Sequence, residues 1–136
     1  MAGARILIVE DDPAIREGVE MNLSLEGYDV ATAADGIAAQ RVLDRQRFDL
    51  VVLDLMLPGR NGFELLRSLR ARDREVPVIL LTAFGDVEGA MAATQAGAWD
   101  YLAKPFDIAE LRATVARALE RRRLSQQRQE SPPPAP

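Results

Sequence analysis

The sequence contains no cysteine and no histidine among its 136 residues. These absences exclude disulfide bonds, a thiol nucleophile, an imidazole general base and a zinc site built from Cys or His. Any chemistry must therefore use carboxylates, hydroxyls, amines or the backbone. Aromatic residues make up only 5% of the chain, so aliphatic side chains supply most of its 48% hydrophobic content, enough for the core of one domain.

Long hydrophobic segments are also missing. The longest apolar runs, such as those at 50–53 and 78–81, are far shorter than the roughly 18 residues that a membrane-spanning helix needs. The first residues lack the charged and apolar regions of a secretory signal. We therefore expect no membrane association and a cytoplasmic location.

Basic residues are scarce in most of the chain, and lysine is nearly absent. Residues 1–111 carry 11 basic and 19 acidic side chains, whereas residues 112–136 carry six arginines and two glutamates. The acidic body and the absence of a recognition motif predict no direct binding to nucleic acid. Of the 17 basic residues only Lys104 is a lysine. It indicates a position that requires a compact ammonium group, although a bias in composition would produce the same count.

Short aliphatic runs alternate with longer amphipathic stretches, which is typical of βαβ units in a parallel sheet. The runs predict strands at 5–9, 28–33, 49–53, 76–81 and 99–103. Between the first two strands we expect a helix that is capped by Asp12 and ends at Gly27. The next helix would face inward with Ile37, Val42 and Leu43. Helices on both faces of the sheet indicate a doubly wound α/β sandwich.

Two later helices differ from the rest. The helix expected at 86–95 is rich in alanine and buries little apolar area, so we expect it to be the most mobile one. The last helix extends past the core, because residues 121–129 are compatible with a helix but almost wholly polar. The proline-rich residues 131–136 cannot continue it. We therefore divide the chain into a domain of residues 1–120 and an extension of residues 121–136 that is a linker or a frayed tail.

Carboxylates follow the first and third predicted strands. Asp11 and Asp12 come after the first strand, and Asp54 comes after the third. Ligands of doubly wound sheets bind beyond the carboxyl ends of the strands, where neighbouring strands would bring these acids together. A hard divalent cation such as Mg²⁺ would offset their charge. As alternatives, Asp12 would only cap a helix, and Asp54 would only bond to its own loop.

A hydroxyl and an ammonium group follow the fourth and fifth strands. Thr82 precedes the small Ala83, and Lys104 precedes Pro105. Both groups suit a tetrahedral anion, although a strand-end hydroxyl and a solvated lysine remain as alternatives. Acids with a metal, a hydroxyl and a lysine around an aspartate describe transfer of a phosphoryl group to a carboxylate, with Asp54 as the nucleophile.

Together these motifs resemble the receiver domain of bacterial two-component response regulators. The resemblance covers about residues 4–120 and rests on the following motifs: Glu10-Asp11-Asp12, Asp54 with Pro58-Gly59 and Gly62, Thr82-Ala83, and Lys104-Pro105-Phe106. It implies a flavodoxin-like five-stranded parallel sheet of order 2-1-3-4-5 with five helices. It also implies a signalling switch that receives its phosphoryl group from a sensor histidine kinase or a histidine phosphotransfer protein. Such a domain is not a conventional enzyme, and it loses the phosphoryl group by slow autodephosphorylation.

The resemblance implies a role for each residue of the site. Asp54 would be the phosphoacceptor, and Lys104 and Thr82 would contact the phosphoryl group. Mg²⁺, with Mn²⁺ as a substitute, would be bound by three carboxylates and one backbone carbonyl, which are those of Asp11, Asp12, Asp54 and Met56. The peptide bond between Lys104 and Pro105 would be cis.

The resemblance also implies a switch. Thr82 would move toward the phosphoryl group and Tyr101 would turn inward, which reshapes the surface of the fourth helix, fifth strand and fifth helix. Met56 and Phe84 occupy positions that tune dephosphorylation in such domains. Both are apolar here, which predicts a long-lived phosphoryl group.

Residues 82–88 and 97–102 look most like receivers of the nitrogen-regulation type, which control sigma-54-dependent activators. Those regulators carry an ATPase and a DNA-binding domain after a helical linker. The chain would therefore stand alone or form part of a longer regulator with an output domain. The arginine-rich extension could also pair two protomers into a homodimer.

Two other classes compete with this interpretation. A haloacid-dehalogenase-type phosphatase also forms an aspartyl phosphate, but it carries a second acid at the position that Met56 occupies here. A receiver-like module that only binds partners usually lacks one of the acids, the threonine or the lysine, and this sequence has all of them. Turnover of p-nitrophenyl phosphate would favour the phosphatase.

Overall fold

The structure, a computed structural model, describes residues 3–57, 62–73, 75–83 and 87–130. Strands and helices alternate along this part of the chain: β1 Arg5–Val9, α1 Pro13–Leu25, β2 Asp29–Ala33, α2 Gly36–Arg45, β3 Leu50–Asp54, α3 Gly62–Arg72, β4 Val78–Ala83, α4 Val87–Gln95, β5 Asp100–Lys104 and α5 Ile108–Glu130. The strands form one parallel sheet in the order β2-β1-β3-β4-β5. The predicted flavodoxin-like sheet is therefore confirmed.

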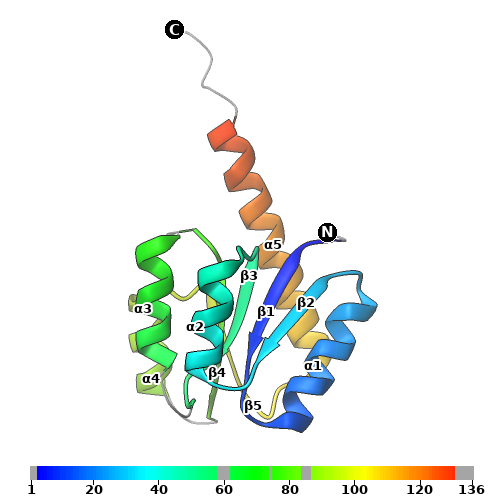
Figure 1. The fold of residues 1–136 in the computed structure, drawn as a ribbon, viewed down its shortest axis with the longest axis vertical. Helices are drawn as coiled ribbons and strands as arrows, with labels where there is room; N and C mark the ends of the chain where they lie inside the picture. Colours follow the sequence, from blue (N-terminus) through cyan, green and yellow to red (C-terminus); the bar gives the residue numbers. More distant parts are fainter. Residues whose placement is uncertain (1–2, 58–61, 74, 84–86, 131–136) are drawn as a thin grey trace, which may run out of the picture.

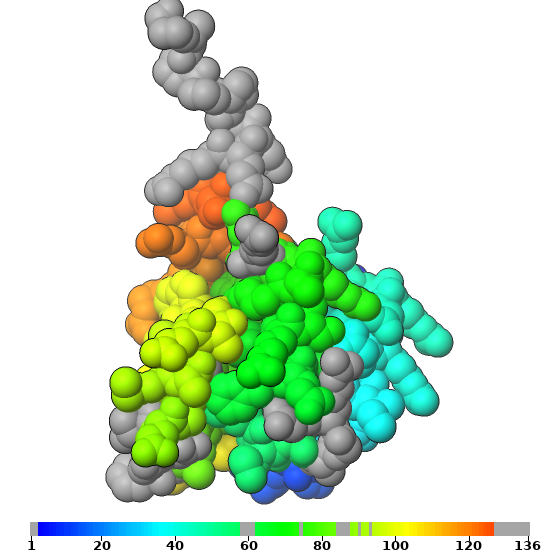
Figure 2. Space-filling model, turned by 90° about the vertical axis from the view of Figure 1, so that its left-hand side faces the viewer, coloured from blue at the N-terminus to red at the C-terminus, as the bar shows by residue number. Residues whose placement is uncertain are grey.

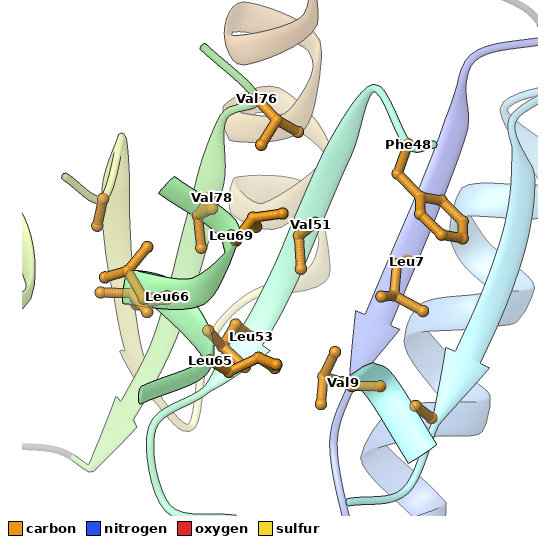
Figure 3. Packing of buried hydrophobic residues seen from close by; sticks show 14 of the residues in the cluster. Leu7, Val9, Phe48, Val51, Leu53, Leu65, Leu66, Leu69, Val76 and Val78 are labelled. Carbon is orange, nitrogen blue, oxygen red and sulfur yellow. The ribbon is translucent and has the colours of Figure 1, made fainter. Parts of the chain in front are cut away.

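Alternating strand residues face two separate cores. On one face, Leu7, Val51 and Val78 belong to a cluster covered by α2 and α3 (Figure 3). On the other face, Ile8 and Val52 belong to a cluster covered by α1 and α5. Every residue of β3 is buried, as expected for a central strand with helices on both sides.

The sequence signals for α1 act as predicted. The Asp12 carboxylate accepts hydrogen bonds from the backbone N–H groups of Ala14 and Ile15 at 2.9 and 3.3 Å, and Pro13 is the first helical residue. After the helix, Gly27 has a φ of 93°, a conformation that glycine adopts without strain. Asp12 therefore makes the N-cap that was the alternative to its role as a metal ligand.

Two local predictions differ from the structure. Ile37 was predicted to face inward, but its side chain is 53% exposed, and Ala39 is buried in its place. Positions 39, 42 and 43 share one helical face, and Ile37 lies on the opposite side. Strand β4 begins at Val78, two residues later than predicted, and runs to Ala83.

Helix α5 continues past the body, at the edge of the sheet opposite the carboxyl ends of the strands (Figure 1). Figure 2 shows this helix, in orange, rising above the covering helices. Arg122 pairs with Asp73 at 3.2 Å, and the Ser125 hydroxyl lies 3.3 Å from a Glu75 carboxylate oxygen. These contacts join the start of the extension to the segment between α3 and β4. Residues 131–136 lie outside the described residues, so the division at residue 120 stays a prediction.

The greater mobility expected of α4 also stays a prediction. Its described side chains are half-buried or exposed. Asp86, its expected first residue, lies outside the described residues. Among the helices of the described ranges, none combines the length and the apolar character required to cross a bilayer.

Candidate functional site

The parallel register places the carboxyl ends of β1, β3, β4 and β5 at one edge of the sheet. Val9 pairs with Leu53, and Asp54 pairs with Leu81, the residue before Thr82. The last residue of β5, Lys104, pairs with the last residue of β4. The strand arrows in Figure 1 therefore end at the edge that carries the predicted site.

Three carboxylates meet at this edge. Glu10, Asp11 and Asp54 each present an oxygen, and these oxygens lie within 4.8 Å of one another. Glu10 and Asp54 are buried, whereas Asp11 is exposed. Like charges at this range repel one another, so the cluster requires a nearby cation.

Lys104 supplies one positive charge. Its Nζ lies 2.5 Å from Glu10 Oε1 and 3.1 Å from Asp54 Oδ2, so the ammonium group joins the two buried carboxylates. Burial lowers the pKa of Lys104, but its contacts with the two acids outweigh this effect and raise the pKa above its ordinary value. The Lys104–Pro105 peptide bond is cis, the isomer that the resemblance implies.

The pKa of Glu10 lies well above its ordinary value. Burial raises its pKa from 4.5 to about 7, against the opposing effect of the hydrogen bond with Lys104. The neighbouring Asp54 also contributes to this rise. Near neutral pH the cluster therefore gains or loses a proton easily.

The loop after β3 holds Asp54 in place. Asp54 Oδ1 accepts a hydrogen bond from the Met56 N–H at 3.0 Å. Gly62, the first residue of α3, packs directly on this loop: a Cβ at this position would lie 2.7 Å from Leu55 Cα and 2.8 Å from the Asp54 carbonyl oxygen. Only glycine fits there without a shift of the backbone.

The acidic cluster differs from the predicted ligand set in one residue. The carboxylate of Asp12 caps α1, and Glu10 takes its place beside Asp11 and Asp54. Sequence reasoning missed Glu10 as a site residue. The strand register of the structure identifies it: Glu10 directly follows Val9, whose register partner Leu53 directly precedes Asp54.

Of the other predicted residues, the structure describes Thr82, Met56 and Tyr101. Thr82 is buried near the end of β4. The side chains of Met56 and Tyr101 are 75% and 45% exposed. The loop residues Pro58 and Gly59 lie outside the described residues, as does Phe84.

The donor set fits a hard divalent cation. All three side chains offer carboxylate oxygens, which Mg²⁺ and Mn²⁺ prefer. When the three acids are ionised, the one ammonium of Lys104 leaves an excess of two negative charges. A divalent cation would balance that excess, and a phosphoryl group bound to such a cation would lie close to Asp54.

Comparison with known families gives one match over most of the chain. Residues 6–116 match the model described as "Response regulator receiver domain". Among curated proteins, the regulator RpaA of Synechocystis is 48% identical over 120 residues, which are 87% of this chain and 49% of the relative. The response regulator PmrA of Pseudomonas aeruginosa is 48% identical over 118 residues, which are 87% of this chain and 53% of the relative. The chain thus spans about half the length of these relatives.

Solved structures agree with the family match. The receiver domain of the Francisella response regulator 1452 superimposes with a TM-score of 0.82 at 32% identity, covering 88% of this chain and 98% of that one. NtrX of Brucella abortus superimposes with a TM-score of 0.90 at 35% identity, covering 96% of this chain and 29% of that one. Because the curated relatives are regulators of other names, the comparisons do not favour the nitrogen-regulation type over other receivers.

Proposed function

Because this chain belongs to the response regulator receiver domain family, which its residues 6–116 match, we propose that it is a switch controlled by phosphorylation of Asp54. The observation that carries the proposal is the placement of Lys104, whose ammonium group contacts both Asp54 and Glu10. Asp11 completes the acidic cluster. This is the arrangement that transfer of a phosphoryl group to a carboxylate requires.

In the proposed reaction an oxygen of Asp54 attacks the phosphorus atom of a phosphohistidine. The new O–P bond forms as the P–N bond breaks, and the electron pair of the broken bond returns to the imidazole nitrogen of the donor. These 136 residues contain no histidine, so the phosphohistidine lies outside them, and the proposed donor is a sensor histidine kinase or a histidine phosphotransfer protein. The chain supplies the acceptor and the groups that offset charge.

The residues around Asp54 have different tasks in this reaction. Glu10, Asp11 and Asp54 would hold Mg²⁺ or Mn²⁺ together with the backbone carbonyl of Met56, while Asp12 fixes the start of α1. The cation supplies electrostatic stabilisation of the transferring phosphoryl oxygens. Lys104 would move its contact from Asp54 to a phosphoryl oxygen, which keeps the ammonium paired throughout.

The buried Thr82 and the exposed Tyr101 would carry the signal to the surface. Thr82 would bond to the phosphoryl group, and Tyr101 would turn into the space beside it. The outer faces of α4, β5 and α5 would change as a result. The exposure of Tyr101 supports this step, because a partly exposed side chain is not fixed by packing in the core.

The curated relatives support a proposal on the location of this domain and on the longer regulator that contains it. RpaA is described as a DNA-binding transcriptional regulator, and this chain covers about half of it. We infer that the domain acts in the cytoplasm and that α5 leads to an output domain in a longer regulator. Assignment to the nitrogen-regulation type and pairing through the extension stay predictions from the sequence.

Incubation with acetyl phosphate tests the proposal. Intact mass spectrometry should show one added phosphoryl group that requires Mg²⁺ and disappears in an Asp54→Asn variant. An Asp12→Asn variant serves as the matched control and should still be modified, since Asp12 caps α1. Equal modification of the Asp54→Asn variant would contradict the proposal.

A further inference from the structure

Arg16 binds the loop that carries two of the clustered acids. This residue lies near the start of α1, and its Nη1 donates hydrogen bonds to the backbone carbonyls of Glu10 and Asp11 at 3.0 and 3.3 Å. Its backbone N–H donates to the carbonyl of Asp12 at 2.9 Å. The arginine side chain thus binds two consecutive carbonyl groups, and the helical backbone binds the third.

The loop is also held from its other side. The Glu10 N–H donates to the Ala33 carbonyl at 3.1 Å, and the Asp12 N–H donates to Glu10 Oε2 at 3.3 Å. Together with the bonds from Arg16, these contacts fix the backbone on both sides of Asp11. The backbone that carries the exposed Asp11 side chain is therefore held in place.

Helix energetics alone do not account for an arginine at this position. A positive charge near the N-terminus of a helix is opposed by the helix dipole. The guanidinium group of Arg16 bonds to carbonyl oxygens of the loop rather than to the clustered carboxylates. Its contacts therefore determine where the loop lies, and they leave the carboxylate oxygens available to a cation.

We propose that Arg16 is a positioning residue for the cation site, acting through the backbone of Glu10 and Asp11. The inference rests on the proposed function, because it requires that the cluster binds Mg²⁺. The proposal predicts in which direction the affinity for Mg²⁺ changes when Arg16 is removed. If Arg16 affected the site only through its charge, its removal would tighten Mg²⁺ binding, because a nearby positive charge would be lost. If Arg16 positions the ligands, its removal weakens binding.

Calorimetric titration with MgCl₂ separates these cases. An Arg16→Met variant keeps the apolar stem and removes the donor. Its affinity for Mg²⁺ should fall about tenfold or more, the usual effect of losing a group that orients a metal ligand. An Arg16→Lys variant should stay close to the wild type, because a single nitrogen makes both side-chain contacts and an ammonium group can replace it.

Two controls make the result specific. An Arg41→Met variant makes the same change on the exposed face of α2 and should leave the affinity unchanged. Thermal unfolding in EDTA reports whether each variant folds. If Arg16→Met does not fold, the Arg16→Lys variant still tests the proposal. Weak Mg²⁺ binding by a folded lysine variant would also overturn it. Unchanged or tighter binding by Arg16→Met overturns the inference. If the wild type itself binds no Mg²⁺, the proposed function fails instead.

Discussion

The buried carboxylate of Glu10 makes the stability of the fold depend on pH. Burial raises its pKa from 4.5 to about 7, so between these values the folded protein holds a proton that the unfolded chain has released. The contribution of Glu10 to stability is therefore fully present below about pH 4.5 and is lost as the pH rises through about 7. Replacing Glu10 with glutamine removes this titration.

The size of the effect follows from the interval between the two pKa values. An interval from 4.5 to about 7 corresponds to about 3 kcal/mol, because one pH unit is worth about 1.4 kcal/mol. This is an upper limit, because structural relaxation and water near the carboxylate reduce the cost of burying its charge. The unfolding free energy of Glu10→Gln minus that of the wild type should increase by up to this amount from pH 4.5 to 8.

Urea denaturation in EDTA, followed by circular dichroism at several pH values, measures this difference. A Glu17→Gln variant on the exposed face of α1 is the control, and its curve should run parallel to that of the wild type. Added Mg²⁺ should reduce the difference for Glu10→Gln, because a bound cation favours the ionised carboxylate. Parallel curves for Glu10→Gln and the wild type across this pH range would refute the reasoning.

Three further predictions concern other parts of the fold. Gly62→Ala should lower the unfolding free energy by about 1–3 kcal/mol in urea denaturation, because the new Cβ would overlap backbone atoms, whereas Gly18→Ala, where a Cβ meets nothing within 4 Å, should raise it by up to about 1 kcal/mol. Asp73→Asn should cost about 1 kcal/mol at pH 7, since the half-exposed carboxylate accepts two backbone hydrogen bonds from the segment between α3 and β4 and pairs with Arg122. Although burial raises the pKa of Asp73, these contacts hold it below its ordinary value of 3.8, so the cost should shrink as the pH falls below that value, as denaturation at pH 3 and 7 would show. Met56→Asn should shorten the lifetime of the phosphorylated protein, because an amide beside the phosphoryl group can orient water, and an unchanged decay rate in a phosphate-affinity gel would contradict this.

The fold could be predicted because its signals are local. Alternation of aliphatic and amphipathic segments indicates a parallel sheet, and a single residue such as Asp12 marks the start of a helix. Whether a residue near the end of a helix is buried depends on tertiary contacts, which are not local in sequence. Ile37 was assigned to the core from its hydrophobicity, but the tertiary packing of α2 selects the face that contains Ala39.

The site was only partly predictable for the same reason. Asp54 and Lys104 were recognised from their places after apolar strands, and the structure brings their side chains within 3.1 Å. The choice between Glu10 and Asp12 depends on where β1 ends relative to β3, which a single sequence does not define to one residue. The contacts of Arg16 are also invisible in sequence, because they depend on how a side chain folds back from its helix onto the preceding loop.

The central claim is that a phosphoryl group is attached to the carboxylate of Asp54. Borohydride reduces an acyl phosphate on aspartate to homoserine, so treatment of the protein after incubation with acetyl phosphate and Mg²⁺ marks the modified residue permanently. Peptide mapping by mass spectrometry should then find homoserine at position 54 and aspartate at positions 11 and 12. Homoserine at another position, or none in a folded protein that binds Mg²⁺, would contradict the account.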